Sequence, residues 1–267
     1  MEYALLAGIG MLSGIIGALI GLGGGVIIVP ALLALFPELS PQKVVGLSVI
    51  TMIFTGLSSV LSYIKVKTVD YRSGFIFFAG SAPGTVVGAF INKNIDLPSF
   101  NLYFGLLLVL LSALLLLRGR LKPVRWFMAH GTERTFTDKQ DQTHTYGYPI
   151  WFALLLTFAI GCASGLFGIG GGSILVPAMI LLFLFPPHVA VGTSMLMVFL
   201  SAVINSVTHI SLGNVTWLYA AALVPGAYIG AKIGAALNQR LNSDALVNVL
   251  RFVLLIFGVR SIFKGIW

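Results

Sequence analysis

The sequence predicts an all-α membrane protein that crosses the bilayer several times and consists of two homologous halves. Three observations predict this fold class. Hydrophobic residues make up 58% of the 267 residues and charged residues only 9%; ten apolar segments follow one another; and one glycine-rich motif occurs twice, 147 positions apart. A soluble monomer of this composition would expose more apolar surface than such proteins tolerate. A lipid bilayer is therefore the expected environment of the chain.

The apolar segments form two sets of five. They cover residues 3–20, 26–36, 44–64, 73–91 and 100–117, and then 150–167, 173–185, 189–209, 216–237 and 246–263. Helices of about 18 to 22 residues reach roughly 27 to 33 Å and can cross the hydrocarbon, whereas residues 26–36 reach only about 17 Å. We therefore predict two bent pairs, residues 3–36 and 150–185, each with a long and a short leg. The first segment has no basic residue before it, so we interpret it as mature protein rather than a signal peptide.

The two halves are predicted to be inverted repeats of five helical segments with broken, glycine-rich hairpins. If both legs of a bent pair cross, or neither does, each half crosses an odd number of times and the second half is inverted; if only one leg crosses, the repeats are parallel. Inversion is favoured because it brings the two glycine bends towards each other from opposite faces. The halves cover residues 1–118 and 150–267, and residues 119–149 form a polar linker, interpreted as solvated, with docking or regulation as the alternative. Basic residues gather in the linker and in the loop 65–72, which the positive-inside rule places in the cytoplasm. Both termini then face outward.

The duplicated motif reads GLGGGVIIVPA at residues 21–31 and GIGGGSILVPA at residues 168–178. Consecutive glycines let backbone amides turn inward, and a helix that starts after them presents unpaired N–H groups and the positive end of its dipole. Two such helix starts could hold a small anion without a buried cation. The alternative is that the glycines only permit a tight bend or close helix packing. Duplication, with Pro30 and Pro177 at matched positions, favours the binding function.

Polar residues in the following segment of each half support an anion site. Ser48 in VVGLSV corresponds to Ser194 in AVGTSM, 146 positions later, and Thr193 and Asn205 add polar groups to the second half. The alternative for each hydroxyl is a bond to its own preceding helical turn or to a neighbouring helix. The candidate substrate-binding residues are Gly21, Gly23, Gly24, Gly25, Ser48, Gly168, Gly170, Gly171, Gly172, Thr193, Ser194 and Asn205, with Pro30 and Pro177 as helix breaks.

Two further features occur at matched positions in both halves, and for each we favour a structural role over a role in transport. The segments APGTVVGA at 82–89 and VPGAYIGA at 224–231 place proline and glycines inside long helices, which indicates a kink or a close crossing. His209 corresponds to Tyr63 and lies at a predicted helix end, so we expect interfacial solvation rather than a proton relay.

These motifs resemble those of the sulfite exporter TauE/SafE family of membrane permeases. The resemblance covers nearly the whole chain apart from the linker, and it rests on Gly21, Gly23–Gly25 and Pro30 together with Gly168, Gly170–Gly172 and Pro177. It implies a multi-pass carrier in a bacterial inner membrane that exports a small sulfur-containing anion, such as sulfite, thiosulfate or a sulfonate. A permease for another small organic anion, and a membrane scaffold that transports nothing, remain alternatives.

Other classes of function find little support. Ser194 and His209 share a helix, but fifteen residues place them about 22 Å apart, so they cannot form a catalytic dyad and no enzyme is predicted. No metal or cofactor site is predicted, and the single cysteine, Cys162, excludes an internal disulfide. The net charge of +8 comes without a nucleic-acid-binding motif. The expected partners are a small anion and the bilayer, with homo-oligomers left open.

The distribution of acidic residues bears on the energy source. All eight lie in the termini, in loops or at segment edges, so no carboxylate is available inside the membrane as a proton relay. Export driven by the membrane potential, or linked to protons through the cargo itself, is therefore expected.

Overall fold

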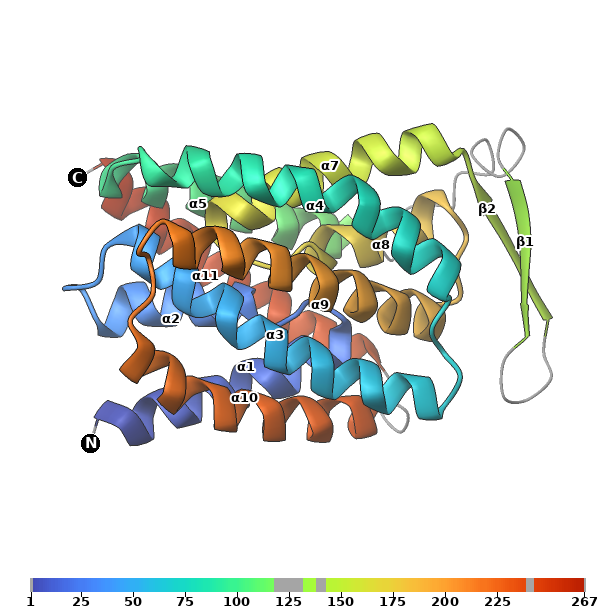
Figure 1. Cartoon of the computed structure of the whole chain (residues 1–267), viewed down its shortest axis with the longest axis horizontal. Helices are drawn as coiled ribbons and strands as arrows, with labels where there is room; N and C mark the ends of the chain where they lie inside the picture. The colour runs from blue at the N-terminus through green and yellow to red at the C-terminus, as the bar shows by residue number, and fades with distance from the viewer. Residues whose placement is uncertain (1, 118–131, 138–142, 239–242, 267) are drawn as a thin grey trace.

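The computed structural model describes residues 2–117, 132–137, 143–238 and 243–266, and these residues form ten helices and one two-stranded hairpin (Figure 1). The helices of the first half are α1 (Glu2–Ile20), α2 (Gly25–Leu35), α3 (Pro41–Lys65), α4 (Tyr71–Lys93) and α5 (Leu97–Leu117). Those of the second half are α7 (Ile150–Phe167), α8 (Gly172–Leu182), α9 (Pro187–Ser211), α10 (Trp217–Asn238) and α11 (Ser243–Ile266). Each predicted apolar segment is one helix, which confirms the predicted all-α class.

Helix ends follow local capping. α3 begins at Pro41, earlier than the apolar pattern predicts, because the Ser40 side chain accepts a bond from the Lys43 amide and proline suits the first helical position. α4 begins after Asp70, whose carboxylate accepts from the Ser73 amide at 3.1 Å. Six helices of the described chain (α1, α3, α4, α7, α9 and α10) are long and apolar enough to cross a membrane.

Both termini lie at one end of the molecule, here called the terminal end, and the hairpin lies at the other, the hairpin end (Figure 1). α1 starts at the terminal end and the short α2 returns to it, so α3 crosses from there to the hairpin end. α7 starts at the hairpin end, α8 returns to it, and α9 crosses in the opposite direction to α3. The homology of the two halves stays a prediction, but their helices run in this opposed sense.

Glycines bring the outer helices into backbone contact. α1 packs along α10, and α7 packs along α4. A Cβ atom added at Gly84 would overlap the carbonyl oxygen of Phe158, and one at Gly226 would overlap that of Ala7. The segments 82–89 and 224–231 therefore form close helix crossings, as predicted, of the kind that small residues permit in membranes. α3 and α9 cross between these outer pairs and are the most deeply buried long helices of the described chain.

The described part of the linker is a hairpin of β1 (Thr132–Thr137) and β2 (Thr143–Tyr148), paired antiparallel. Glu133 and Thr135 are exposed, as a solvated linker requires, but Tyr146 and Tyr148 are buried. The Tyr146 hydroxyl donates to the Asp70 carboxylate at 2.7 Å. The Tyr148 hydroxyl contacts the Ser73 hydroxyl oxygen, also at 2.7 Å, and its ring packs against the Phe183 ring with centroids 4.9 Å apart. The hairpin is therefore docked on the start of α4 and the end of α8.

Removing the Tyr146 hydroxyl should loosen this docking. Burial, followed by the neighbouring Asp70 carboxylate, raises the pKa of Tyr146, so the docked hairpin favours the neutral phenol. That contribution to stability is present below the ordinary tyrosine pKa of about 10 and is lost as the pH rises above it. Tyr146→Phe should cost about 1 kcal/mol of unfolding free energy near pH 7 and should lessen the loss of stability above pH 10, measured by thermal unfolding in detergent. The exposed Tyr103, replaced by Phe, is the control, and an equal cost there would contradict the docking role.

Candidate substrate site

Two glycine bends separate the legs of the bent pairs. The first bend, residues 21–24, joins α1 to α2, and the second bend, residues 168–171, joins α7 to α8. Gly21, Gly23, Gly24, Gly168 and Gly170 have φ angles between +66° and +91°, which L side chains rarely adopt. Gly171 is different, since its φ is −62° and an added Cβ would meet Ile160 Cγ2 at 2.7 Å. Backbone conformation requires glycine at the first five positions, whereas a side chain at Gly171 would require the Ile160 and Met197 side chains to shift.

The two bends contact each other in the interior. A Cβ atom at Gly25, the first residue of α2, would overlap the carbonyl oxygen of Gly168, and one at Gly172, the first residue of α8, would overlap that of Gly21. All residues from 21 to 25 and from 168 to 172 are buried. The structure thus brings the predicted glycines of both halves together.

The predicted hydroxyls hold the bends across the halves. Ser48 Oγ on α3 donates to the Gly168 carbonyl at 2.6 Å, and Ser194 Oγ on α9 donates to the Gly21 carbonyl at 2.8 Å. Both serines are fully buried. In this conformation each hydroxyl is therefore occupied by a carbonyl of the opposite half.

The other two predicted polar residues lie beside the bends rather than on them. Thr193 Oγ1 accepts from the Asp70 amide at 3.0 Å, which ties α9 to the loop before α4. Asn205 Nδ2 donates to the Ser164 carbonyl in the last turn of α7 at 3.4 Å, and its buried Oδ1 has no partner among the described residues. Asn205 therefore has a free acceptor, Oδ1, beside the last turn of α7, which precedes the second bend.

Further side chains satisfy the last carbonyls of α1 and α7, which have no intrahelical partner. Asn238 Nδ2 donates to the Leu19 carbonyl at 2.6 Å, and Asn92 Nδ2 donates to the Leu166 carbonyl at 2.8 Å. Neither asparagine is among the residues predicted from the sequence. Their spacing of 146 positions, the same as that of Ser48 and Ser194, is the signal that could have found them.

Tyr63 and His209 form a corresponding pair. The Tyr63 hydroxyl donates to the Ala18 carbonyl at 2.7 Å, and His209 Nε2 lies 3.3 Å from the Gly165 carbonyl oxygen. The prediction of interfacial solvation for His209 is wrong, because its side chain is fully buried and its Nδ1 lies 3.1 Å from Asn214 Nδ2. Its ring is a structural partner of α7.

The first turns of α2 and α8 retain unpaired donors. Among the hydrogen bonds of the described residues, the amides of Gly25, Val26, Gly172 and Ser173 have no acceptor.

The predicted helix breaks at Pro30 and Pro177 are wrong, because both prolines lie inside continuous helices and the breaks fall at the glycines. A proline in the second helical turn removes one backbone bond without ending a helix already started.

The surroundings of the bends are uncharged: the buried hydroxyls of Ser48 and Ser194 lie beside them, and their other side-chain neighbours are mostly apolar, among them Met52 and Val198. Of the carboxylates whose side chains the structure describes, Glu2, Glu38, Asp70, Asp96 and Glu133 all lie at helix ends, in loops or in the hairpin. A negative solute at the bends would therefore face amides, hydroxyls and apolar side chains, without a fixed negative charge from these carboxylates beside it.

Comparison with known proteins agrees with this architecture. Residues 6–261 match the family model described as sulfite exporter TauE/SafE. The chain is 47% identical to the probable membrane transporter protein YunE of Bacillus subtilis (strain 168), with 100% of both chains covered. It is 30% identical to a probable membrane transporter protein of Xylella fastidiosa (strain Temecula1), over 89% of this chain and 85% of that one, and 27% identical to YjnA of Bacillus subtilis, over 95% and 97%. The chain therefore belongs to the sulfite exporter TauE/SafE family of multi-pass membrane transporters.

Proposed function

We propose that this transporter exports a small sulfur-containing anion, of the sulfite, thiosulfate or sulfonate class, across a bacterial inner membrane and binds it at the two glycine bends. The observation that carries the proposal is the meeting of two helix starts with unpaired amides in a buried site whose serines lie within bonding distance. Helix starts of this kind attract oxyanions through their N–H groups and their dipoles. The family name favours a sulfur oxyanion within that class.

Binding requires the bends to separate, since no atom fits between Gly25 and the Gly168 carbonyl as they stand. When they part, Ser48 and Ser194 lose their carbonyl acceptors and can donate to the anion instead. The same hydroxyls then stabilise the closed and the loaded conformations. This exchange lets the site open without leaving buried donors unpaired.

The driving force in this proposal is the membrane potential, worth about 2.3 kcal/mol per charge per 100 mV. The linker and hairpin lie in the cytoplasm and both termini face outward, according to the distribution of basic residues. Export of an anion from a negative interior is then downhill, without a protein carboxylate to relay protons.

The test is a ligand panel on the purified chain, followed by flux. Sulfite, thiosulfate, sulfonates, sulfate and small carboxylates are added separately, and the melting temperature is recorded, because a ligand that binds the folded form stabilises it. Proteoliposomes loaded with any stabilising anion should release it faster when the voltage is set to favour anion exit. Stabilisation by carboxylates alone would support the organic-anion permease, and no stabilisation with no flux would support a scaffold. If the flux does not depend on voltage, the proposal that the membrane potential drives export is wrong.

A further inference from the structure

The turn after α3 contains a lysine where the corresponding turn after α9 has a glycine. The Lys67 and Thr68 amides donate to the Ile64 and Tyr63 carbonyls at 3.1 and 3.2 Å. The amides of residues 213 and 214 donate to those of residues 210 and 209 at 3.0 and 2.9 Å, 146 positions later. The two helices thus end in the same hydrogen-bonded motif, in which the left-handed residue is usually glycine.

Lys67 occupies that left-handed position with φ of +54°, whereas Gly213 occupies it with φ of +72°. A lysine there is strained, because its Cβ crowds the backbone, and a glycine is not. The turn that ends α3 does not require a lysine, since the same turn at the end of α9 has a glycine. Strain retained at one residue suggests that its side chain has a function.

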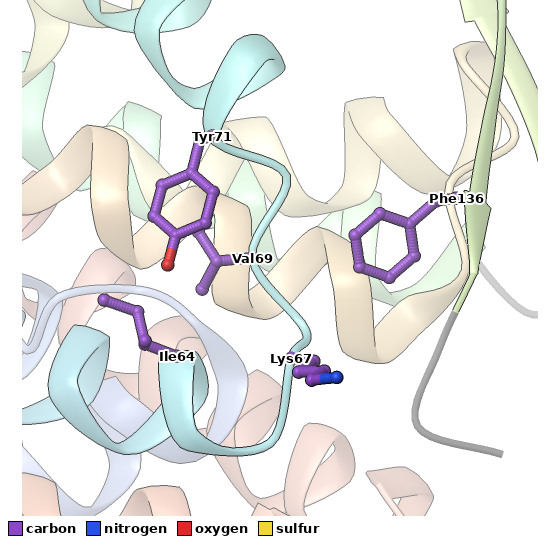
Figure 2. A pocket seen from close by; sticks show the side chains of 5 residues that line it. All are labelled: Ile64, Lys67, Val69, Tyr71 and Phe136. Carbon is purple, nitrogen blue, oxygen red and sulfur yellow. The ribbon is translucent and has the colours of Figure 1, made fainter. Parts of the chain in front are cut away.

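The Lys67 side chain lines a pocket of about 300 Å³ at the hairpin end. Figure 2 shows the pocket between the end of α3, the start of α4 and strand β1, with Lys67 on the connecting loop. The remaining lining residues are Ile64, Val69, Tyr71 and Phe136. The pocket therefore offers one ammonium and one phenol hydroxyl among apolar walls, which suits an anionic group attached to an apolar chain.

The charge of Lys67 is available to a ligand. In the described part of the chain no carboxylate forms an ion pair with it, and the nearby Asp70 carboxylate is engaged by Ser73 and Tyr146. Lys65 and Arg72 are exposed on either side in the sequence and add to the positive potential. Among the described residues, no carboxylate therefore occupies the Lys67 ammonium in place of a bound anion.

The pocket adjoins an apolar surface that faces outward. Ile64 and Tyr71 are 38% and 48% exposed. One turn further from the loop, Leu61 on α3 and Phe75 on α4 are 47% and 55% exposed. In a multi-pass membrane protein such a surface contacts acyl chains, and tyrosine and lysine at helix ends lie at the headgroup level.

We propose that this pocket binds an anionic phospholipid, with the phosphate at Lys67 and an acyl chain along Leu61, Ile64 and Phe75. Lysines near a membrane surface attract anionic headgroups, and basic pockets at helix ends hold them. The proposal needs only the membrane location and is independent of the transported anion.

The experiment compares phosphatidylglycerol with phosphatidylcholine added to the full chain in neutral detergent. Phosphatidylglycerol should raise the melting temperature more than phosphatidylcholine does. Lys67→Asn keeps a residue that tolerates the left-handed conformation and removes the charge; it should weaken apparent phosphatidylglycerol binding roughly fivefold, while Lys67→Arg should retain it. Lys67→Gly should relieve the strain, so that the lipid-free protein melts higher yet loses the preference for phosphatidylglycerol.

Lys93→Asn, an exposed lysine in the last turn of α4, is the matched control and should behave like the unaltered chain. Soluble glycerol phosphate, added at the same concentration, separates a lipid site from a site for free phosphate. The proposal is overturned if Lys67→Asn responds to phosphatidylglycerol like the unaltered chain, if phosphatidylcholine stabilises equally, or if glycerol phosphate reproduces the effect.

Discussion

Alanine at Gly25 or Gly172 is expected to reduce transport at least tenfold and to destabilise the protein by about 1 to 3 kcal/mol per site. Neither glycine has a positive φ, so the backbone itself accepts alanine at both positions. The added methyl group would instead overlap a carbonyl oxygen of the opposite bend, that of Gly168 or of Gly21. Since backbone cannot move aside as the end of a side chain can, the bends must separate.

The measurements are thermal unfolding in detergent and anion flux in proteoliposomes. Gly8→Ala is the control, because Gly8 is exposed on α1 and a Cβ there has no atom within 4 Å. Normal melting and normal flux in Gly172→Ala would show that the two bends need not touch. Normal melting without flux would locate the effect in the transport cycle.

The second large effect is expected from Ser48→Ala combined with Ser194→Ala. Each substitution leaves one buried carbonyl, of Gly168 or Gly21, without its side-chain donor. A buried group left unpaired costs about 1 to 3 kcal/mol. Because the bends contact each other, the first substitution should already loosen the contact that the second serine supports, so the two costs should not add.

A double-mutant cycle measures this coupling, which should exceed about 0.5 kcal/mol. Ser62→Ala is the matched control, since Ser62 lies on the same helix as Ser48 but donates to the Ser58 carbonyl of its own preceding turn. Strict additivity of the two serine substitutions would mean that each hydroxyl acts alone. A loss as large in Ser62→Ala would point to a general effect of hydroxyl removal in α3.

The helices were predictable because burial in lipid leaves a strong signal. One apolar run corresponds to each helix of the described chain, and only the ends differ, as where Ser40 caps α3 earlier than the hydropathy indicates. The hairpin was not predicted, although residues 132–137 and 143–148 are rich in threonine and aromatic residues. Tyr146 and Tyr148 are buried only because Asp70, Ser73 and Phe183 come from other parts of the chain.

The glycines and serines of the candidate site were found through duplication, which makes weak signals stand out. What each hydroxyl bonds to could not be predicted, since the Gly168 carbonyl lies 120 positions from Ser48. Asn92 and Asn238 were missed for a related reason. A polar residue near a helix end usually contacts water, and only the folded structure shows that these two contact a neighbouring helix.

The hydrogen bonds that α9 and α10 donate to the first bend and to the end of α1 also have a consequence for biogenesis. During synthesis α1 and α2 enter the membrane long before α9 and α10 are made. Until then the Leu19 carbonyl lacks its donor Asn238, and the Gly21 carbonyl lacks its donor Ser194. The amino-terminal portion is therefore expected to remain unfinished, and open to quality-control proteases, until the last third of the polypeptide has been inserted. Variants that weaken α9 or α10 should accordingly show their first defect as degradation of the nascent protein.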